Sequence, residues 1–186
     1  MIDYRPLTPN DGPLVESLFG ANGACGGCWC MHWRIATHGA AWKAAQGEPN
    51  RVALMGLIAA GAVHAVLAMR DDVPIGWCCF GPKDSFPRLM QTKGLQRDSA
   101  RRVWSIVCLF LPRGARRQGI GTGLVAAACD AAFQAGADEV EAYPVPTAAG
   151  AVVPAAFAWT GVPAQYDAAG FRSVGRPGGR LIYLKV

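Results

Sequence analysis

Residues 108–125, CLFLPRGARRQGIGTGLV, join an apolar run to a helix-forming run through a loop rich in glycine and arginine. The apolar run starts further back, at Val103, and its β-branched and aromatic side chains predict a buried central strand that reaches Leu111. The alanine-rich run of residues 119–137 predicts a helix that Gly136 ends. This part of the chain therefore predicts a strand, a loop and a helix in direct succession.

The loop of residues 112–122, called the phosphate loop below, has the composition of an anion-binding segment. Its glycines let the backbone turn tightly and come close to a ligand. The first amides of the following helix point outward, and the helix dipole favours an anion there. Arg113, Arg116 and Arg117 can add charge-assisted hydrogen bonds. We therefore expect the loop to bind a phosphate or a pyrophosphate.

Two common phosphate-binding patterns do not fit this loop. A P-loop needs a lysine before its Ser or Thr, whereas Gly121 directly precedes Thr122 here. The dinucleotide fingerprint needs a third glycine at the position of Leu124, and its loop usually follows the first strand of a fold. A glycine-rich turn with a solvated basic face remains an alternative interpretation.

Length and composition favour one folded domain that covers residues 1–186. Hydrophobic residues make up 52% of the chain and charged residues 17%, which is typical of a globular protein. The chain opens without a signal peptide and has seven cysteines, so we expect a cytoplasmic protein with reduced thiols. The apolar segment of residues 52–69 is marginal as a membrane span. We expect instead a buried helix to about Ala60, a turn at Gly61 and a strand after it.

The order of the predicted elements indicates an α/β fold with a mixed sheet. Before the central strand we expect a short strand at residues 2–5, a helix that reaches about Leu18 and is capped by Thr8, Asn10 or Asp11, a cysteine-rich loop, and a helix capped by Asn50. A β-hairpin at residues 64–81 and a basic segment with a short helix at residues 83–102 follow. After the helix that follows the central strand we expect a strand at residues 138–145, a Pro- and Ala-rich insert from 144 to about 154, a short helix at residues 163–171, and a closing strand pair with its turn at PGG, residues 177–179.

Two segments resemble a known family. Residues 116–121, RRQGIG, have the Arg/Gln-x-x-Gly-x-Gly/Ala spacing of the acetyl-coenzyme A loop in the GNAT superfamily of N-acyltransferases. Residues 165–171, QYDAAGF, are similar to that family's LYEKLGF segment, with Tyr166 four residues before Gly170. The element order resembles that of the family over essentially the whole chain. The loop alone is moderately specific, and the three features together are strong.

The resemblance implies a GNAT-like fold, with a mixed central sheet of about six to seven strands flanked by helices and with splayed central strands. It also implies acetyl-CoA as co-substrate and transfer of its acetyl group, by direct attack, to a primary amine of an unidentified acceptor, a small amine or a peptide. The residues that it assigns to the cofactor are Leu109, Phe110 and Leu111 for the pantetheine arm, Arg116, Arg117, Gln118, Gly119, Ile120 and Gly121 for the pyrophosphate, and Thr122 for an added hydroxyl.

The resemblance assigns the general acid to Tyr166, which would protonate the leaving thiolate of coenzyme A. A phenol with a pKa of about 10 suits that step because a thiol has a similar pKa. The base stays open between Glu139, Glu141 and a water chain; the two carboxylates share one face of their predicted strand, and Glu141 is the catalytic candidate. The chain departs from the family pattern at Trp159, where the family often has an asparagine that contacts the cofactor.

The stretch CGGCWCMHW, residues 25–33 and called the Cys-rich loop below, allows several interpretations. Cys25, Cys28, Cys30 and His32 could form a very compact zinc set, but four ligands within eight residues of one loop are unusual. We expect no metal site. The favoured interpretation is a wall of the acceptor pocket, in which cysteines act as small buried hydrophobic groups. The pocket residues predicted in this way are Cys28, Trp29, Cys30 and Trp33.

Two competing functions stay open. The net charge of +5 could reflect a nucleic-acid-binding module, whose candidate residues are Arg97, Arg101, Arg102, Arg113, Arg116 and Arg117. These arginines lack interleaved aromatic residues, and the chain shows no known nucleic-acid-binding motif. The other competitor is a zinc- or redox-dependent regulator built on the Cys-rich loop. We expect neither a nucleic-acid nor a membrane partner, and a homodimer is left open.

Overall fold

The computed structural model describes residues 1–36, 38–147, 154, 158–175 and 181–186. Its described strands form one seven-stranded sheet in the order β1-β2-β3-β4-β5-β7-β6, in which β4 and β5 pair parallel and the other neighbours pair antiparallel. The strands are β1 (Asp3–Pro6), β2 (His64–Arg70), β3 (Val73–Pro82), β4 (Val103–Phe110), β5 (Glu139–Ala142), β6 (Arg172–Ser173) and β7 (Tyr183–Lys185). The predicted mixed sheet with β4 at its centre is confirmed.

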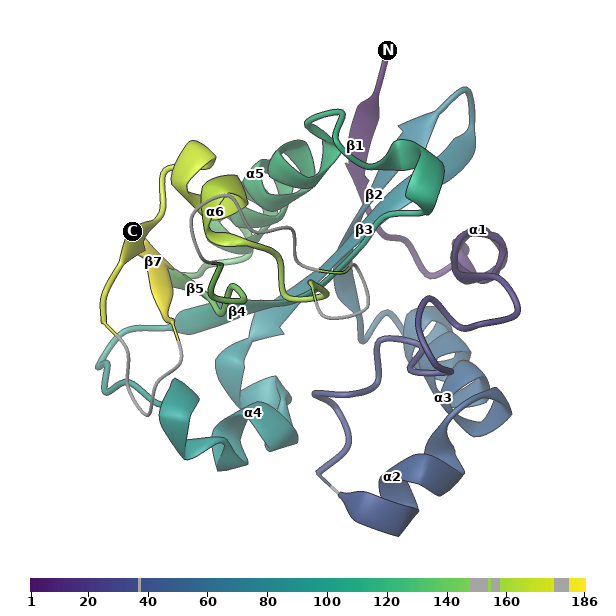
Figure 1. Cartoon of the computed structure of the whole chain (residues 1–186), viewed down its shortest axis with the longest axis horizontal. Helices are drawn as coiled ribbons and strands as arrows, with labels where there is room; N and C mark the ends of the chain where they lie inside the picture. Colours follow the sequence, from purple (N-terminus) through teal and green to yellow (C-terminus); the bar gives the residue numbers. More distant parts are fainter. Residues whose placement is uncertain (37, 148–153, 155–157, 176–180) are drawn as a thin grey trace.

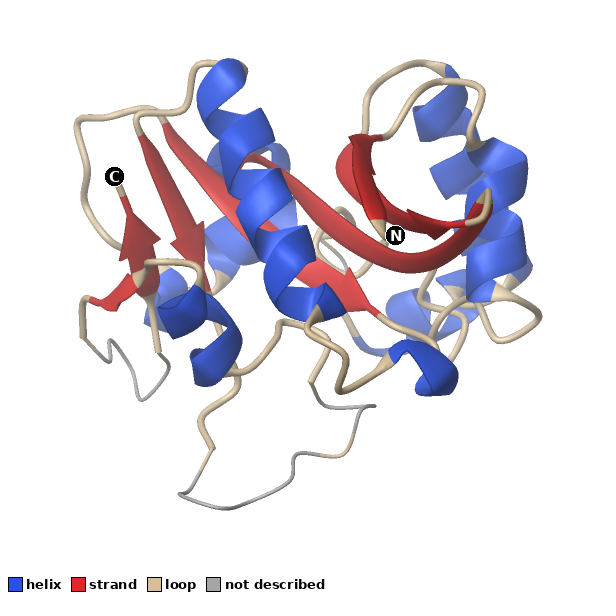
Figure 2. Cartoon of the chain, turned by 90° about the horizontal axis from the view of Figure 1, so that it is seen from above, coloured by secondary structure: helices blue, strands red, loops and turns tan. Residues whose placement is uncertain are grey.

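Helices cover both faces of this sheet (Figures 1 and 2). One face carries α5 (Ile120–Gln134) and α6 (Pro163–Ala168), whereas the other carries α1 (Gly12–Phe19), α2 (Gly39–Ala45), α3 (Glu48–Ala59) and α4 (Pro87–Gln91). Three short 3-10 helices complete the described elements: η1 (Lys83–Ser85), η2 (Lys93–Leu95) and η3 (Arg113–Ala115). Each face has its own hydrophobic cluster, and β4 contributes side chains to both.

The two central strands separate after a bulge in β4. Parallel pairing with β5 runs from Val103 opposite Glu139 to Ile106 opposite Ala142 and stops there. On the other side of β4, Ile106 pairs with Phe80 while Cys108 pairs with Cys79, so Val107 is an extra residue in the strand. Because β4 continues beyond this bulge without β5 beside it, the sheet opens between the two strands. The splay implied by the family resemblance is therefore present.

The apolar segment of residues 52–69 divides as predicted. It covers most of α3, a turn at Gly61 with φ of 67°, and most of β2. The β2–β3 hairpin turns through Asp71 and Asp72, both with positive φ (49° and 60°), as expected for a two-residue turn that matches the strand twist. Within the described part of the chain, no helix is long and apolar enough to cross a membrane.

The predicted cap Asn50 is wrong, whereas Asp11 occupies the N-cap position of α1 but makes no side-chain cap hydrogen bond. Asn50 lies inside the first turn of α3, whose N-cap is Gly47, and its amide donates to the carbonyls of Gly27 and Cys28 at 3.1 and 3.3 Å. Asp11 does precede α1, but its carboxylate makes no cap hydrogen bond because Arg5 and the Thr8 amide occupy it.

Three further points of the predicted element order need comment. Helix α2 was not predicted from the sequence at all. The PGG turn, residues 177–179, and most of the insert at residues 144–154 lie outside the described residues.

Candidate functional site

The phosphate loop offers a row of unsatisfied backbone donors at the start of α5. Within the described residues, the amides of residues 117–122 donate to no protein acceptor. Arg117 and Gly119 have φ of 59° and 76°, and this alternation of left-handed and right-handed backbone turns successive amides toward one point. Together with the α5 dipole, the geometry is that of an anion-binding nest.

Side chains of the phosphate loop hold its shape. Nε of Arg116 donates to the carbonyl of Leu111 at 2.9 Å, and Nε2 of Gln118 donates to that of Gly114 at 2.7 Å. Nη2 of Arg70, at the end of β2, donates to Oε1 of Gln118 at 2.9 Å. Arg116 and Gln118 therefore brace the loop, while its amides stay available to a ligand.

Two glycines bring the loop, the end of β4 and α6 together. A Cβ on Gly121 would stand 2.2 Å from Nε2 of Gln165 and 3.5 Å from Leu111. A Cβ on Gly161 would stand 2.8 Å from the ring of Tyr166 and 2.9 Å from Leu109. The sequence-predicted cofactor residues of β4 and α5 and the predicted acid of α6 are thus neighbours.

Tyr166 is fully buried at this junction. Its hydroxyl donates to the carbonyl of Thr160 at 2.9 Å, and its ring packs edge-on against Phe171 with centroids 5.2 Å apart. Burial raises the pKa of Tyr166 well above its ordinary value. The phenol therefore keeps its proton, which is the state that a proton donor requires.

The chain itself fills the splay between β4 and β5. The amide of Leu109 donates to the carbonyl of Trp159 at 2.7 Å, and the indole Nε1 of Trp33 donates to the carbonyl of Val107 at 3.0 Å. The rings of Trp33 and Trp159 are themselves in contact, with centroids 5.6 Å apart. These β4 groups face the opening where β5 has left the sheet, so a ligand lying along β4 has to displace at least the Trp159 carbonyl.

The three predicted pantetheine residues do not share one face. Leu109 and Leu111 pack with the cluster beneath α5. Phe110 points to the opposite face, where its ring meets that of Phe19 with centroids 5.5 Å apart. Phe110 therefore borders the side of the sheet that carries the Cys-rich loop.

Glu141 is held in a closed network, and this geometry does not favour the predicted role of general base. The residue is fully buried, and its carboxylate accepts from Nζ of Lys83 at 2.8 Å, from Nε of Arg97 at 2.7 Å and from the Tyr143 hydroxyl at 2.9 Å. Both of its oxygens therefore already accept hydrogen bonds from within the fold. The Ser105 hydroxyl, 2.8 Å from the Tyr143 hydroxyl, extends the network toward β4.

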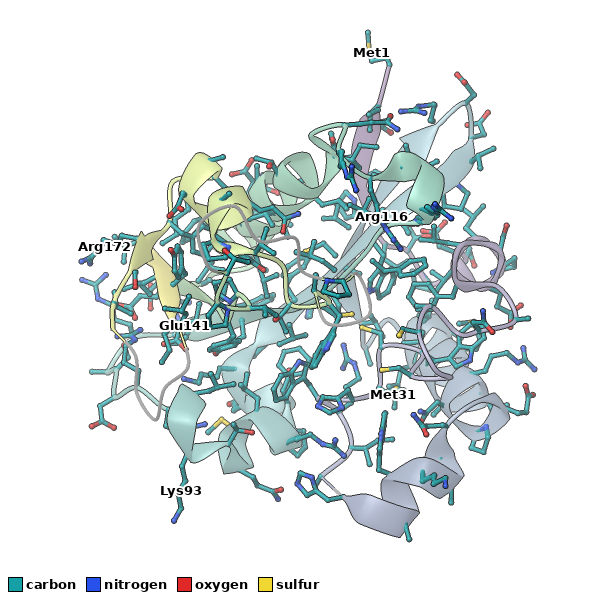
Figure 3. All side chains as sticks on the ribbon, in the orientation of Figure 1. Met1, Met31, Lys93, Arg116, Glu141 and Arg172 are labelled. Atoms are coloured by element: carbon teal, nitrogen blue, oxygen red, sulfur yellow. The ribbon has the colours of Figure 1, made fainter. Side chains whose placement is uncertain are left out.

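Glu139 is engaged in a similar way on the same strand. Arg97 and Ser99 donate to its carboxylate, and Arg101 lies 3.7 Å away. Burial acts to raise the pKa of Glu139, but the bond and charge of Arg97 outweigh it and the pKa is lowered. Neither carboxylate contacts Tyr166 among the interactions of the described residues, and Figure 3 shows Glu141 well separated from Arg116 in the phosphate loop.

These ion pairs also bear on nucleic-acid binding. Arg97 and Arg101 pair with glutamates, and Arg102 pairs with Asp138 at 3.0 Å. The basic stretch that could have formed a phosphate-binding face therefore has its charge partly neutralised within the fold.

The Cys-rich loop packs inward as a constrained turn. Trp29 and Cys30 both have positive φ, 46° and 57°, which is rare for non-glycine residues. Gly23 makes room for the indole of Trp29, because a Cβ there would lie 2.3 Å from its Nε1. Trp29, Cys30 and Trp33 are buried, while Cys28 is only partly buried. Of this predicted set, Trp33 is the residue that reaches the splay.

The thiols near this loop form a buried group. Nε1 of Trp77 donates to Sγ of Cys30 at 3.4 Å, and the Cys30 thiol is in hydrogen-bonding contact with those of Cys79 and Cys108. All seven cysteines are unpaired. A search of the described residues finds no group of three or more His, Cys, Asp or Glu side chains arranged to hold a metal ion.

Sequence reasoning did not single out several residues of these contacts. Arg34 and Tyr143 were missed, Lys83 and Arg88 were expected only as members of the basic segment of residues 83–102, and Trp159 was noted only as a departure from the family pattern. Tyr143 carried a usable signal, because it follows Glu141 by two residues and so shares its face of the strand. The other residues come from segments far away in the sequence.

Comparisons with known proteins agree with this geometry. The model of the acetyltransferase (GNAT) family matches residues 30–152. Among solved structures, the PaiA N-acetyltransferase of Thermoplasma acidophilum in complex with coenzyme A is 15% identical with a TM-score of 0.56, covering 100% of this chain and 98% of its own. An N-acetyltransferase from Staphylococcus aureus Mu50 is 12% identical with a TM-score of 0.56 over 100% and 98% of the two chains. Aminoglycoside acetyltransferase AAC(6')-Ib, in complex with coenzyme A and kanamycin, is 18% identical with a TM-score of 0.55 over 100% and 95%. No curated protein sequence matches the chain.

Proposed function

Since this chain belongs to the acetyltransferase (GNAT) family, we propose that it transfers an acetyl group from acetyl-CoA to a primary amine. The observation that carries the proposal is the row of amides of residues 117–122, which have no acceptor in the described part of the chain and lie at the start of α5 beside the splayed end of β4. Similar folds are solved with coenzyme A, which supports the same cofactor here.

In the proposed complex, the phosphate loop binds the pyrophosphate. The amides of residues 117–121 donate to its oxygens, whereas the Arg116 amide already donates to the Arg113 carbonyl at 3.4 Å. The partly exposed Thr122 adds its hydroxyl. The pantetheine arm lies along residues 109–111 of β4. There the pantetheine arm accepts the hydrogen bond that the Leu109 amide otherwise donates to the Trp159 carbonyl.

The proposed reaction is a direct transfer. The amine nitrogen attacks the thioester carbonyl carbon, the C–S bond breaks, and the departing sulfur takes the proton of Tyr166. For that step the phenol turns from the Thr160 carbonyl toward the sulfur. The amine proton leaves to water, and the Tyr166 phenolate regains a proton from water. Water takes this role because both oxygens of Glu141 already accept hydrogen bonds from Lys83, Arg97 and Tyr143.

The predicted acceptor wall keeps a place in this proposal. Trp33 lines the splay directly, and Trp29 and Cys30 support it from the hydrophobic cluster behind. Cys28, which is partly exposed, lies at the rim of the same loop.

Two measurements test the proposed function. Acetyl-CoA at 100 times its Kd should stabilise the protein by about 2.7 kcal/mol, seen as a rise in Tm. Tyr166→Phe should keep this rise and lower kcat by about 10²- to 10⁴-fold in a thiol-release assay, because general acid catalysis contributes about that much. Tyr183→Phe is the matched control, since its ring packs against that of Tyr166. Absence of a cofactor-induced Tm rise would exclude the function, and full activity of Tyr166→Phe would exclude the acid.

A further inference from the structure

Arg34, on the strand-facing side of the chain segment after the Cys-rich loop, is a cation in an apolar setting. Its guanidinium lies over the ring of Phe86, 5.1 Å from the centroid, and its Nη2 donates to Sγ of Cys79 at 3.5 Å. Its Nε is enclosed and has no hydrogen-bond partner. The residue as a whole is only partly buried.

The described part of the protein supplies no anion to this guanidinium. None of the ion pairs of the described residues includes Arg34. The neighbouring thiols do not act as a counterion of Arg34 either. The hydrogen bond with Cys30, together with burial, raises the pKa of Cys79 well above its usual range, and the hydrogen bond with Cys108 does the same for Cys30. Arginine stays charged under all ordinary conditions. The charge of Arg34 therefore has no counterion among the described residues.

The backbone on both sides of Arg34 is fixed by one residue of α4. The amide of Arg88 donates to the carbonyl of Trp33 at 3.2 Å, and its Nε donates to that of Ile35 at 2.9 Å. The Arg88 guanidinium also lies over the ring of Trp42, 4.9 Å from its centroid. The backbone that carries Arg34 is therefore held in place before any ligand arrives, which lowers the cost of ordering a binding group.

Arg34 lies close to the opening between β4 and β5. Its sulfur partner Cys79 lies on β3 directly opposite Cys108 of β4. Cys108 is next to Leu109, whose amide faces the opening between β4 and β5. Trp33, the residue before Arg34, reaches the same opening through its indole. Arg34 thus stands beside the proposed reaction centre on the face that carries the Cys-rich loop.

We propose that Arg34 binds a carboxylate of the acceptor, so that the acceptor is an amine that also carries an acidic group, such as an amino acid. The planar fork of arginine matches a carboxylate in a two-bond geometry, and Nη1 and Nη2 are the atoms that meet it. This inference rests on the proposed acetyl transfer and narrows its acceptor to one chemical class.

The test uses matched amines with the whole chain and acetyl-CoA. The pairs are L-alanine with L-alaninamide, L-phenylalanine with L-phenylalaninamide, and 4-aminobutyrate with butylamine, assayed by thiol release. We expect kcat/KM to favour the carboxylated member of at least one pair by about 10- to 100-fold, as a hydrogen-bonded charge pair of 1.5–3 kcal/mol would give. Arg34→Met should abolish this preference, and Arg34→Lys should keep only part of it.

Stability separates a binding role from a structural one. Removing an uncompensated cation that the fold does not use should leave Tm of Arg34→Met unchanged or raise it by about 2–4 °C. A structural arginine would lower it. Arg172→Met, at the exposed far edge of the sheet in Figure 3, should change neither Tm nor the preference.

The outcomes distinguish this inference from the function on which it rests. If acetyl-CoA raises Tm but no carboxylated amine is acetylated in preference to its partner, the carboxylate site is wrong and the cofactor site stands. The same holds if Arg34→Met keeps the preference or loses more than about 4 °C in Tm. If acetyl-CoA gives no Tm rise, the proposed function itself fails, and the carboxylate site falls with it.

Discussion

The phosphate loop and the Cys-rich loop differ in which atoms give them their form. The phosphate loop exposes backbone amides, and its side chains serve mainly to brace it. The Cys-rich loop buries its side chains in the hydrophobic cluster on the other face of the sheet. A site made of backbone amides can bind the same ligand with many different side chains around it. A site made of packed side chains can be shaped to one acceptor, but then the same side chains also support the fold.

The largest expected effect is on the packed side of this comparison. Trp29→Ala should lower the free energy of unfolding by about 3–5 kcal/mol, because it empties a space that a buried indole fills against Phe19. Urea denaturation measures the change. A loss below about 1 kcal/mol would show that the Cys-rich loop does not contribute to the core as the structure indicates.

A smaller effect should follow from a single lost hydrogen bond in the splay. Trp33→Phe keeps an aromatic ring but leaves the buried carbonyl of Val107 without its donor, which costs about 1–3 kcal/mol. Trp42→Phe, on the partly exposed α2, is the matched control and should cost less. Equal losses in the two variants would show that the indole donor has no special part in closing the splay.

Acid should weaken the packed side through Asp11. The hydrogen bond from Arg5 lowers the pKa of the buried Asp11 from 3.8 to about 2. A carboxyl whose folded pKa is depressed stabilises the fold above its unfolded pKa, and this contribution, up to about 2 kcal/mol, is lost as the pH falls from about 4 through about 2. Asp11→Asn should remove this part of the pH dependence of unfolding. An unchanged profile in the variant would show that other carboxyls dominate acid unfolding.

The smallest stability effect is expected in the phosphate loop. Arg116→Ala should change the free energy of unfolding by no more than about 0.5 kcal/mol, because the side chain is exposed. It should nevertheless reduce the Tm rise that acetyl-CoA produces, since Arg116 braces the loop through the Leu111 carbonyl. If stability fell as far as in Trp29→Ala, the contrast between the two loops would disappear.

The same contrast explains what the sequence could predict. The strand, the phosphate loop and α5 are continuous in the chain, and their glycines and alanines act through local backbone preferences, so their structure could be predicted. The partners of Glu141 could not, because Lys83 and Arg97 lie 58 and 44 residues away in the sequence. A pair of carboxylates on one strand face suggested catalysis, whereas in the structure both carboxylates pair with cations from a distant segment.

The prediction of Asn50 as a helix cap was wrong for a related reason. Asn50 has a side chain typical of a helix cap, but its side-chain amide donates to two carbonyls of the Cys-rich loop instead. Trp159 also carried no local signal, because its contribution to the splay is a backbone carbonyl and any residue type has one. Positions that act through long-range contacts are therefore the ones that sequence patterns did not identify.

The extra residue in β4 places two consecutive side chains, Val107 and Cys108, on one face of the strand. Before Val107 and after it, β4 places side chains beneath α5 at Ile106 and again at Leu109, an odd step that a regular strand does not allow. Deleting Val107 would restore strict alternation, with Ile106 and Leu109 still beneath α5 and Cys108 still on the opposite face. Such a deletion would thus remove the bulge without exchanging the two faces of the strand, whereas Val107→Ala would keep both the faces and the bulge.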